Sequence, residues 1–191
     1  MYLLERCKIV DFSEKTINTD YKFIGEIIKL RVDTVTTPSG NTATRELVEH
    51  PGGVAVVALT DDHKIIMEWQ YRRPFDRNVY EIPAGKRDIG EDPLSCGKRE
   101  LEEETGFKAK KFTYLGSMLP TPGFCSEVLH MYVATGLYEG HVKRDQDEFL
   151  ELEQVPIESV VEKILNGEIV DAKTCVAVLK VNELIRRGVI K

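Results

Sequence analysis

The chain has 191 residues, of which 42% are hydrophobic and 30% charged, a composition typical of one globular domain with a small extension. Its formal net charge of -6 argues against general binding to nucleic acid, which requires a basic face. It does not exclude a small anionic substrate that meets local basic residues.

The first part of the chain is predicted to form strands joined by turns. The candidate strands are rich in β-branched residues and alternate in part between polar and apolar positions. They span residues 22–35, 45–50, 52–60, 64–72 and 79–83, with turns at 37–41 and 61–64. We place a boundary near residue 45, so that residues 1–44 form an N-terminal antiparallel β segment with little core of its own. Such a segment must pack on something, and a partner subunit is one candidate.

A helix is predicted next, between two local signals. Asp92 suits the N-cap and Pro93 suits the first helical position, where its missing N–H costs nothing. Gly106 suits the residue just past the helix end. Leu94 and Leu101 share one stripe, which would pack on a sheet.

Strands return after this helix, and two further helices are predicted near the end of the chain. The strands span residues 112–119, 128–137 and 149–155, and the helices span residues 156–166 and 172–187. Strands around one central helix, with more helix at the end, indicate a mixed α/β sandwich over residues 45–191.

Four glutamates crowd the end of the first predicted helix. Glu100, Glu103 and Glu104 share one helical face, whereas Glu102 points elsewhere. Two carboxylates ~6 Å apart repel by about 3 kcal/mol at an intermediate dielectric, and the helix macrodipole adds to the cost. A cation between them reverses the sign of this energy, and such hard oxygen ligands suit Mg²⁺ or Mn²⁺. The alternative is a solvated acidic face.

The residues around these glutamates follow a fixed pattern. The pattern is Gly85, five residues, Glu91, seven residues, then Arg99-Glu100-Leu101-x-Glu103-Glu104-x-Gly106-Phe107. It resembles the Nudix box at every defined position. The resemblance implies an α/β/α sandwich with a mixed sheet, and an enzyme that hydrolyses a nucleoside diphosphate linked to another moiety.

The resemblance also implies roles for the residues of the box. Glu100 and Glu104 would be the principal metal ligands, and Glu103 a further ligand, direct or through water. The backbone carbonyl of Ala84 would also bind the metal. A divalent cation would neutralise the diphosphate, activate water and orient the phosphorus for attack.

Four other residues of the box would be structural by the same resemblance. Arg99 and Glu91 would form an ion pair that orients the helix. Gly85 and Gly106 would allow the backbone to turn at either end of the motif.

Two flanking stretches, EIPAGK and PTPGFCSE, resemble the ADP-ribose pyrophosphatase branch of this family. There Arg72 would bind the diphosphate or stack near the adenine, with Arg73 as the alternative. Arg45 could reach a substrate across a dimer interface, and Glu127 is a further candidate for substrate binding. Arginine suits such roles because its planar fork pairs with phosphate and also stacks. A surface ion pair is the alternative reading of each arginine.

In this branch a loop carboxylate completes the site as general base or extra metal ligand. The matching loop holds Asp145, Asp147 and Glu148, of which we choose Glu148. A loop with three acidic residues is otherwise a solvated one.

We therefore expect an enzyme that depends on Mg²⁺, with Mn²⁺ as the alternative metal, and that converts ADP-ribose to AMP and ribose 5-phosphate. The alternatives are a pyrophosphatase for another nucleotide sugar, such as GDP-mannose, and a non-catalytic sensor with the same fold. The resemblance further implies a homodimer. Neither a transmembrane-length apolar run nor a signal-peptide stretch is present, and the four cysteines form no C-x-x-C pair. We expect a cytoplasmic protein with free thiols and with no nucleic-acid or membrane partner.

Overall fold

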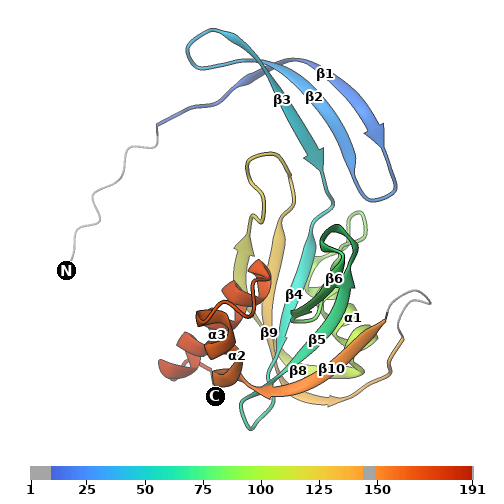
Figure 1. Ribbon diagram of the computed structural model, residues 1–191, viewed down its shortest axis with the longest axis vertical. Coiled ribbons are helices and arrows are strands. Elements are labelled where there is room, and N and C mark those ends of the chain that lie inside the picture. The colour runs from blue at the N-terminus through green and yellow to red at the C-terminus, as the bar shows by residue number, and fades with distance from the viewer. Residues whose placement is uncertain (1–9, 144–148, 191) are drawn as a thin grey trace, which may run out of the picture. The chain divides into compact units, whose positions relative to one another are not determined.

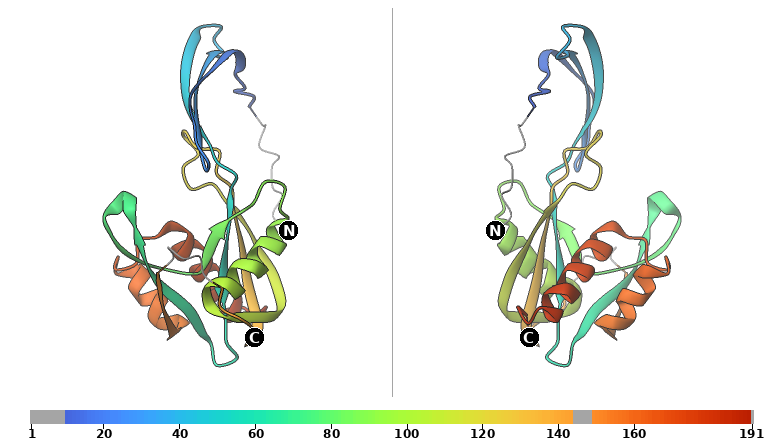
Figure 2. Two further views of the ribbon diagram at one scale, coloured as in Figure 1. Left: turned by 90° about the vertical axis from the view of Figure 1, so that its right-hand side faces the viewer. Right: turned by 90° about the vertical axis from the view of Figure 1, so that its left-hand side faces the viewer.

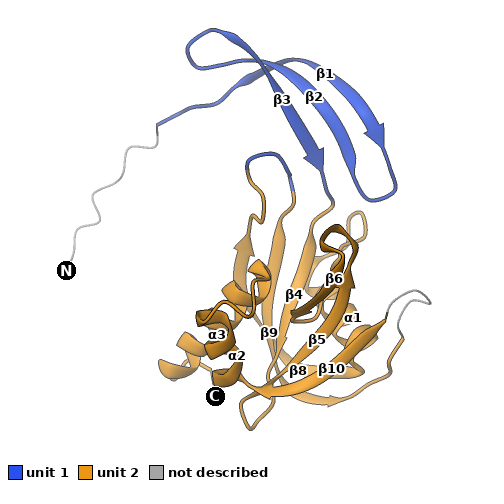
Figure 3. Ribbon diagram, viewed as in Figure 1, with its two compact units in different colours: residues 1–50, 123–126 blue, residues 51–122, 127–191 orange. Residues whose placement is uncertain are grey.

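The computed structural model describes residues 10–143 and 149–190, and it divides the chain into two compact units. The first unit runs to His50 and includes Gly123–Ser126, and the second holds Pro51–Pro122 and the chain from Glu127 onward (Figure 3).

The first unit is a three-stranded antiparallel sheet in the order β1-β2-β3. Its strands are β1 Lys15–Ile24, β2 Lys29–Thr36 and β3 Thr42–Glu49. The stretch 22–35, predicted as one strand, instead turns at Gly25, whose amide donates to the Ile28 carbonyl at 2.9 Å. Strand β1 was not predicted, because it is largely polar and all its residues are exposed. Val35 is the buried apolar side chain among the described residues of this unit, so the sheet has little core of its own.

The second unit contains two further sheets, one mixed and one antiparallel. The mixed sheet has the order β7-β4-β9-β8, with β4 and β9 parallel, and the other sheet has the order β10-β5-β6. The strands are β4 Gly53–Ala58, β5 Lys64–Arg72, β6 Arg77–Glu81, β7 Ala84–Lys86, β8 Phe107–Met118, β9 Leu129–Glu139 and β10 Leu150–Pro156. A 3₁₀ turn, η1 Arg73–Phe75, joins β5 to β6.

Helices cover both faces of the mixed sheet (Figures 1 and 2). They are α1 Pro93–Thr105, α2 Ile157–Leu165 and α3 Ala172–Arg186. Strand β4 is buried on both faces. Val54 and Val56 belong to one core cluster with Leu101 of α1, whereas Ala55 and Val57 belong to the other with residues of α3. This arrangement confirms the predicted α/β/α sandwich with a mixed sheet.

Cys96, Cys125 and Cys175 are free thiols. No helix in the described part of the chain is both long enough and apolar enough to cross a membrane.

Candidate active site

The acidic cluster lies on α1, whose ends are fixed by local interactions. The Asp92 carboxylate accepts a hydrogen bond from the Ser95 amide at 3.0 Å, and Pro93 occupies the first turn. At the other end Gly106 has a φ of 74°, and its amide donates to the Glu102 carbonyl at 2.8 Å. Both helix ends therefore lie where the sequence predicts them.

Arg99 is the centre of an ion-pair network on this helix. Its Nε lies 3.1 Å from Glu91 Oε1, and its Nη1 lies 2.8 Å from Glu100 Oε1 and 3.0 Å from Glu103 Oε2. Its Nη2 also donates to the Lys86 carbonyl at 3.1 Å. The hydrogen bond from Arg99 is the main reason why the pKa of Glu91 is lowered to about 2. The same bond raises the pKa of Arg99. The network joins β7 and the loop before α1 to the acidic face of the helix.

Two of the glutamates meet strand β7. Glu104 is 1% exposed, and its Oε2 accepts a hydrogen bond from the Ala84 amide at 3.1 Å. The Glu100 carboxyl lies against Gly85 so closely that a Cβ on this glycine would be 1.9 Å from Glu100 Cδ. Gly85 is not among the glycines with positive φ, so close approach, and not the expected backbone turn, requires a glycine here.

These side chains suit a divalent cation by their chemistry, because three carboxylates and the nearby backbone of Ala84 offer only hard oxygen ligands. The space beside Gly85 that a Cβ would fill is occupied by the Glu100 carboxyl, so this carboxyl lies directly against β7. Over residues 10–143 and 149–190, no three acidic, histidine or cysteine side chains converge closely enough to hold a metal as they stand. Arg99 contacts Glu100 and Glu103 in this arrangement. For Glu103 to bind a metal directly, its carboxylate would have to turn away from Arg99.

Arg72, at the end of β5, is held by a buried carboxylate. Its Nε donates to Glu81 Oε1 at 2.7 Å, and Glu81 is 1% exposed at the end of β6. Burial opposes the charge on Arg72, yet the hydrogen bond and the charge of Glu81 raise its pKa. The second oxygen of Glu81 pairs with Lys173 of α3. Arg72 is therefore fixed within the fold, although it remains partly exposed.

The other candidate substrate residues lie in different surroundings. Arg73 is an exposed residue of η1 and pairs with Asp76 at 2.9 Å. Arg45 belongs to the first unit, where it pairs with Glu14. Glu127 is half-buried at the start of the segment that leads into β9. Asp145, Asp147 and Glu148 lie outside the described residues.

Sequence reasoning missed the network behind Arg72. Glu81 is part of the EIPAGK stretch but was not singled out, and Lys173 was predicted only as a helix residue. One signal was available, because a lysine in the first turn of a helix is disfavoured by the macrodipole and calls for an acidic partner. The identity of that partner was not accessible, since the two residues lie 92 positions apart.

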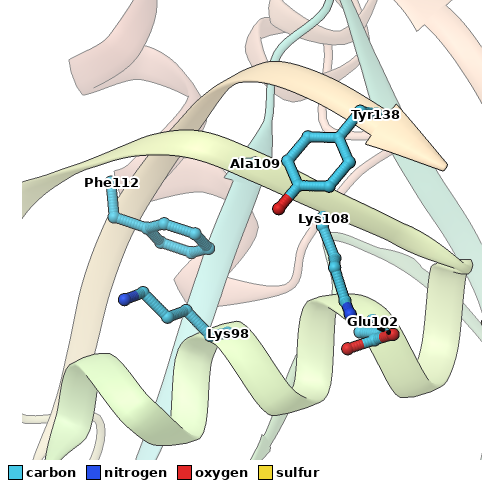
Figure 4. A pocket seen from close by; sticks show the side chains of 6 residues that line it. All are labelled: Lys98, Glu102, Lys108, Ala109, Phe112 and Tyr138. Atoms are coloured by element: carbon cyan, nitrogen blue, oxygen red, sulfur yellow. Dashed lines mark ion pairs between the residues drawn. The ribbon is translucent and has the colours of Figure 1, made fainter. Parts of the chain in front are cut away.

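The opposite side of α1 borders a separate cavity of about 320 Å³ (Figure 4). Glu102 lines this cavity and pairs there with Lys108 at 3.0 Å. The rings of Phe112 and Tyr138 and the side chain of Lys98 also line it. Glu102 is thus on a different side of the helix from the other glutamates, as its helical position predicts.

Comparison with known proteins identifies the family. The profile of the NUDIX domain matches residues 49–174. The chain is 46% identical over 169 residues to a protein from Bacillus methanolicus named methanol dehydrogenase activator, covering 87% of this chain and 91% of the relative. It is 45% identical over 167 residues to the ADP-ribose pyrophosphatase of Bacillus subtilis (strain 168), covering 86% and 90%. The chain therefore belongs to the Nudix hydrolase family.

A solved structure, the crystal structure of an ADP compounds hydrolase, has the same fold. It superposes with a TM-score of 0.80 at 22% sequence identity, covering 93% of this chain and 97% of the other. At this identity the match supports the fold and not the substrate.

Proposed function

We propose that this enzyme hydrolyses the diphosphate linkage of ADP-ribose to give AMP and ribose 5-phosphate. The observation that carries the proposal is the complete Nudix box in a chain that is 45% identical to an ADP-ribose pyrophosphatase over 86% of its length. The carboxylates of Glu104 and Glu100 beside Ala84 and Gly85 are suited to a cation, and the anchored guanidinium of Arg72 is suited to the diphosphate of such a substrate.

In this proposal Glu100, Glu103, Glu104 and the carbonyl of Ala84 hold Mg²⁺ or, alternatively, Mn²⁺. The bound cation supplies charge neutralisation at the diphosphate and a more acidic water. Glu104 is suited to such a role because its carboxylate is buried and oriented by the Ala84 amide. Glu91 and Arg99 keep the helix and its preceding loop in place.

Arg72 is the proposed contact of the diphosphate, because its guanidinium is fixed on Glu81 and still partly exposed. Arg73 remains the alternative, although its pairing with Asp76 on the surface gives it no comparable support. Glu148, or its neighbour Asp147, would accept the proton of the attacking water. Glu127 is a further proposed substrate contact.

The proposal also covers assembly. Residues 1–44 would form the interface of a homodimer and contact the base of the substrate. Arg45, which follows this segment, would reach a substrate bound by the partner subunit. Strand β1 supports this, because its residues are all exposed and include Ile17, Phe23 and Ile24. Apolar side chains gathered on so small a sheet favour a partner surface. The proposed location of the dimer is the cytoplasm.

The test is product analysis on a panel of nucleotides with Mg²⁺: ADP-ribose, GDP-mannose, UDP-glucose, diadenosine polyphosphates and NADH. We expect preferential conversion of ADP-ribose to AMP. Preferential cleavage of GDP-mannose would instead establish the other nucleotide-sugar activity. If no member of the panel is cleaved with either Mg²⁺ or Mn²⁺, the non-catalytic alternative replaces the proposed reaction.

A second candidate function is activation of a methanol dehydrogenase. The observation that favours it is the 46% identity to the protein named methanol dehydrogenase activator. Adding the purified chain with Mg²⁺ to a methanol dehydrogenase tests it. A several-fold increase in dehydrogenase rate supports the role, and an unchanged rate contradicts it.

A further inference from the structure

A buried carboxylate lies between two cations behind Arg72. Glu81 is 1% exposed, and each of its oxygens has its own cation: Oε1 takes the Nε of Arg72 at 2.7 Å, and Oε2 takes the Nζ of Lys173. An ionised carboxylate is costly to bury unless it is paired and hydrogen-bonded. Because both oxygens are occupied, the carboxylate is held in one orientation.

Lys173 is itself held by the start of α3. Its Nζ lies 3.1 Å from the Asp171 carboxylate, and its side chain is only 12% exposed. Neighbouring Thr174 is fully buried, and its hydroxyl donates to Asp171 at 2.7 Å and accepts from the Ile82 amide at 3.0 Å. The first turn of α3 is therefore hydrogen-bonded to Ile82, the residue that follows Glu81. A cation in this turn opposes the helix macrodipole, and the two carboxylates offset that cost.

The result is a guanidinium with one side fixed and the other side available. Arg72 uses its Nε for Glu81, while its two terminal nitrogens donate to no protein atom in the described part of the chain. Its side chain is 36% exposed, whereas that of Arg73 is 84% exposed. An arginine that is already fixed loses less conformational entropy when it binds an anion with its remaining donors.

We infer that Glu81 and Lys173 are positioning residues, which orient Arg72 so that its terminal nitrogens face the diphosphate of the substrate. The inference rests on the proposed function for the role of Arg72 itself. The inference adds that Lys173, in the first turn of α3 and outside the Nudix box, affects substrate binding through Glu81.

A double-mutant cycle tests the inference with Lys173→Met and Arg72→Ala, each alone and combined. We expect Lys173→Met to lower kcat/KM for ADP-ribose about 10-fold, mainly through KM, because it loosens a binding group. In the Arg72→Ala background the same change should cost less than about 2-fold, since the residue that Lys173 positions is gone. Arg187→Met is the matched control, because Arg187 follows the last residue of α3 and its loss breaks an exposed ion pair with Glu183 of that helix.

Equal losses in both backgrounds would overturn the inference, because a general structural role of Lys173 does not depend on Arg72. Circular dichroism and thermal unfolding of the four proteins show whether each is folded. If Lys173→Met does not fold, Lys173→Arg replaces it. That variant keeps the charge and should retain more activity than Arg72→Ala.

A second measurement needs no substrate. The Nε–H signal of Arg72 in a ¹⁵N NMR spectrum should exchange slowly with water in the parent protein and rapidly in Lys173→Met. An equally protected signal in both proteins would show that Lys173 does not fix the guanidinium. If the parent protein leaves ADP-ribose intact, the proposed function fails. The NMR comparison still decides whether the residues act on Arg72, and the cycle is repeated on the nucleotide that the enzyme cleaves.

Discussion

Glu104 shows how a single residue links the fold to the proposed chemistry. Its carboxylate is buried and is oriented by the amide of Ala84, the residue just before the Nudix box. Glu102, two positions earlier, lies on the other side of the helix and pairs with Lys108. Glu102 and Glu104 are both glutamates of helix α1, so they form a matched pair for mutation.

Glu104→Gln should fold normally and lose turnover. The amide retains an oxygen that can accept the Ala84 hydrogen bond, whereas the charge that holds a cation is lost. We expect kcat to fall by about 100-fold or more, in the range seen when one preorganised electrostatic group is removed. Steady-state kinetics with Mg²⁺ measures the loss, and Glu102→Gln should stay within about 2-fold of the parent. Near-parental turnover by Glu104→Gln would contradict the metal assignment.

The ion pair between Glu91 and Arg99 should make stability depend on pH. The pKa of Glu91 is lowered from 4.5 to about 2 in the folded protein, chiefly by the hydrogen bond from Arg99. The stabilisation is therefore complete above pH 4.5 and is lost as the pH falls toward 2. With allowance for solvent screening, the pair should contribute about 1–2 kcal/mol to the free energy of unfolding.

Urea unfolding of the parent protein and of Glu91→Gln, at neutral pH and at about pH 2, measures this contribution. The two proteins should differ at neutral pH and converge in acid. A difference that is the same at both values would mean that Glu91 does not titrate with its partner.

At the scale of elements, the contact between β7 and α1 determines where the carboxylates lie. Gly85→Ala should disrupt it, because the added Cβ would lie 1.9 Å from Glu100 Cδ. We expect a loss of about 1–3 kcal/mol of stability from overpacking, together with a loss of activity as Glu100 is displaced. Thermal unfolding and kinetics measure both effects. Gly123→Ala is the control, since a Cβ there meets no atom within 4 Å. Equal stability and equal activity of the two variants would contradict the close contact between Gly85 and Glu100.

The elements differ in how far the sequence could predict them. Helix α1 was predicted closely, because its cap Asp92, its first residue Pro93 and its terminal Gly106 are local signals. Strand β1 was missed, because its sequence is largely polar and its pairing with β2 decides its structure. The cluster of Arg72, Glu81 and Lys173 could not be predicted either, since it joins three elements through contacts between distant parts of the chain.

At the scale of the whole molecule, the first unit is the part whose stability is not explained by its own core. Val35 is its buried apolar residue within the described chain, while side chains such as Phe23 are exposed. The Nudix box, by contrast, could be recognised from the sequence alone, because its spacing depends on a single helix and its flanks. The proposed partner of the first sheet could not be deduced in this way, since its binding would depend on a surface and not on a motif.

The proposed homodimer predicts a molecular mass twice that of one chain in light scattering coupled to size-exclusion chromatography. Replacing Phe23 and Ile24 of β1 with serine should shift the protein toward the monomer, because the two side chains are exposed and apolar. A parent protein that elutes as a monomer at micromolar concentration would contradict the assembly.

The most direct test of the central claim is ³¹P NMR of ADP-ribose incubated with the parent protein and Mg²⁺. We predict that the diphosphate signals are replaced by the two phosphomonoester signals of AMP and ribose 5-phosphate, and that EDTA prevents the change. Persistence of the diphosphate signals, in a sample that cleaves another nucleotide under the same conditions, would contradict the claim.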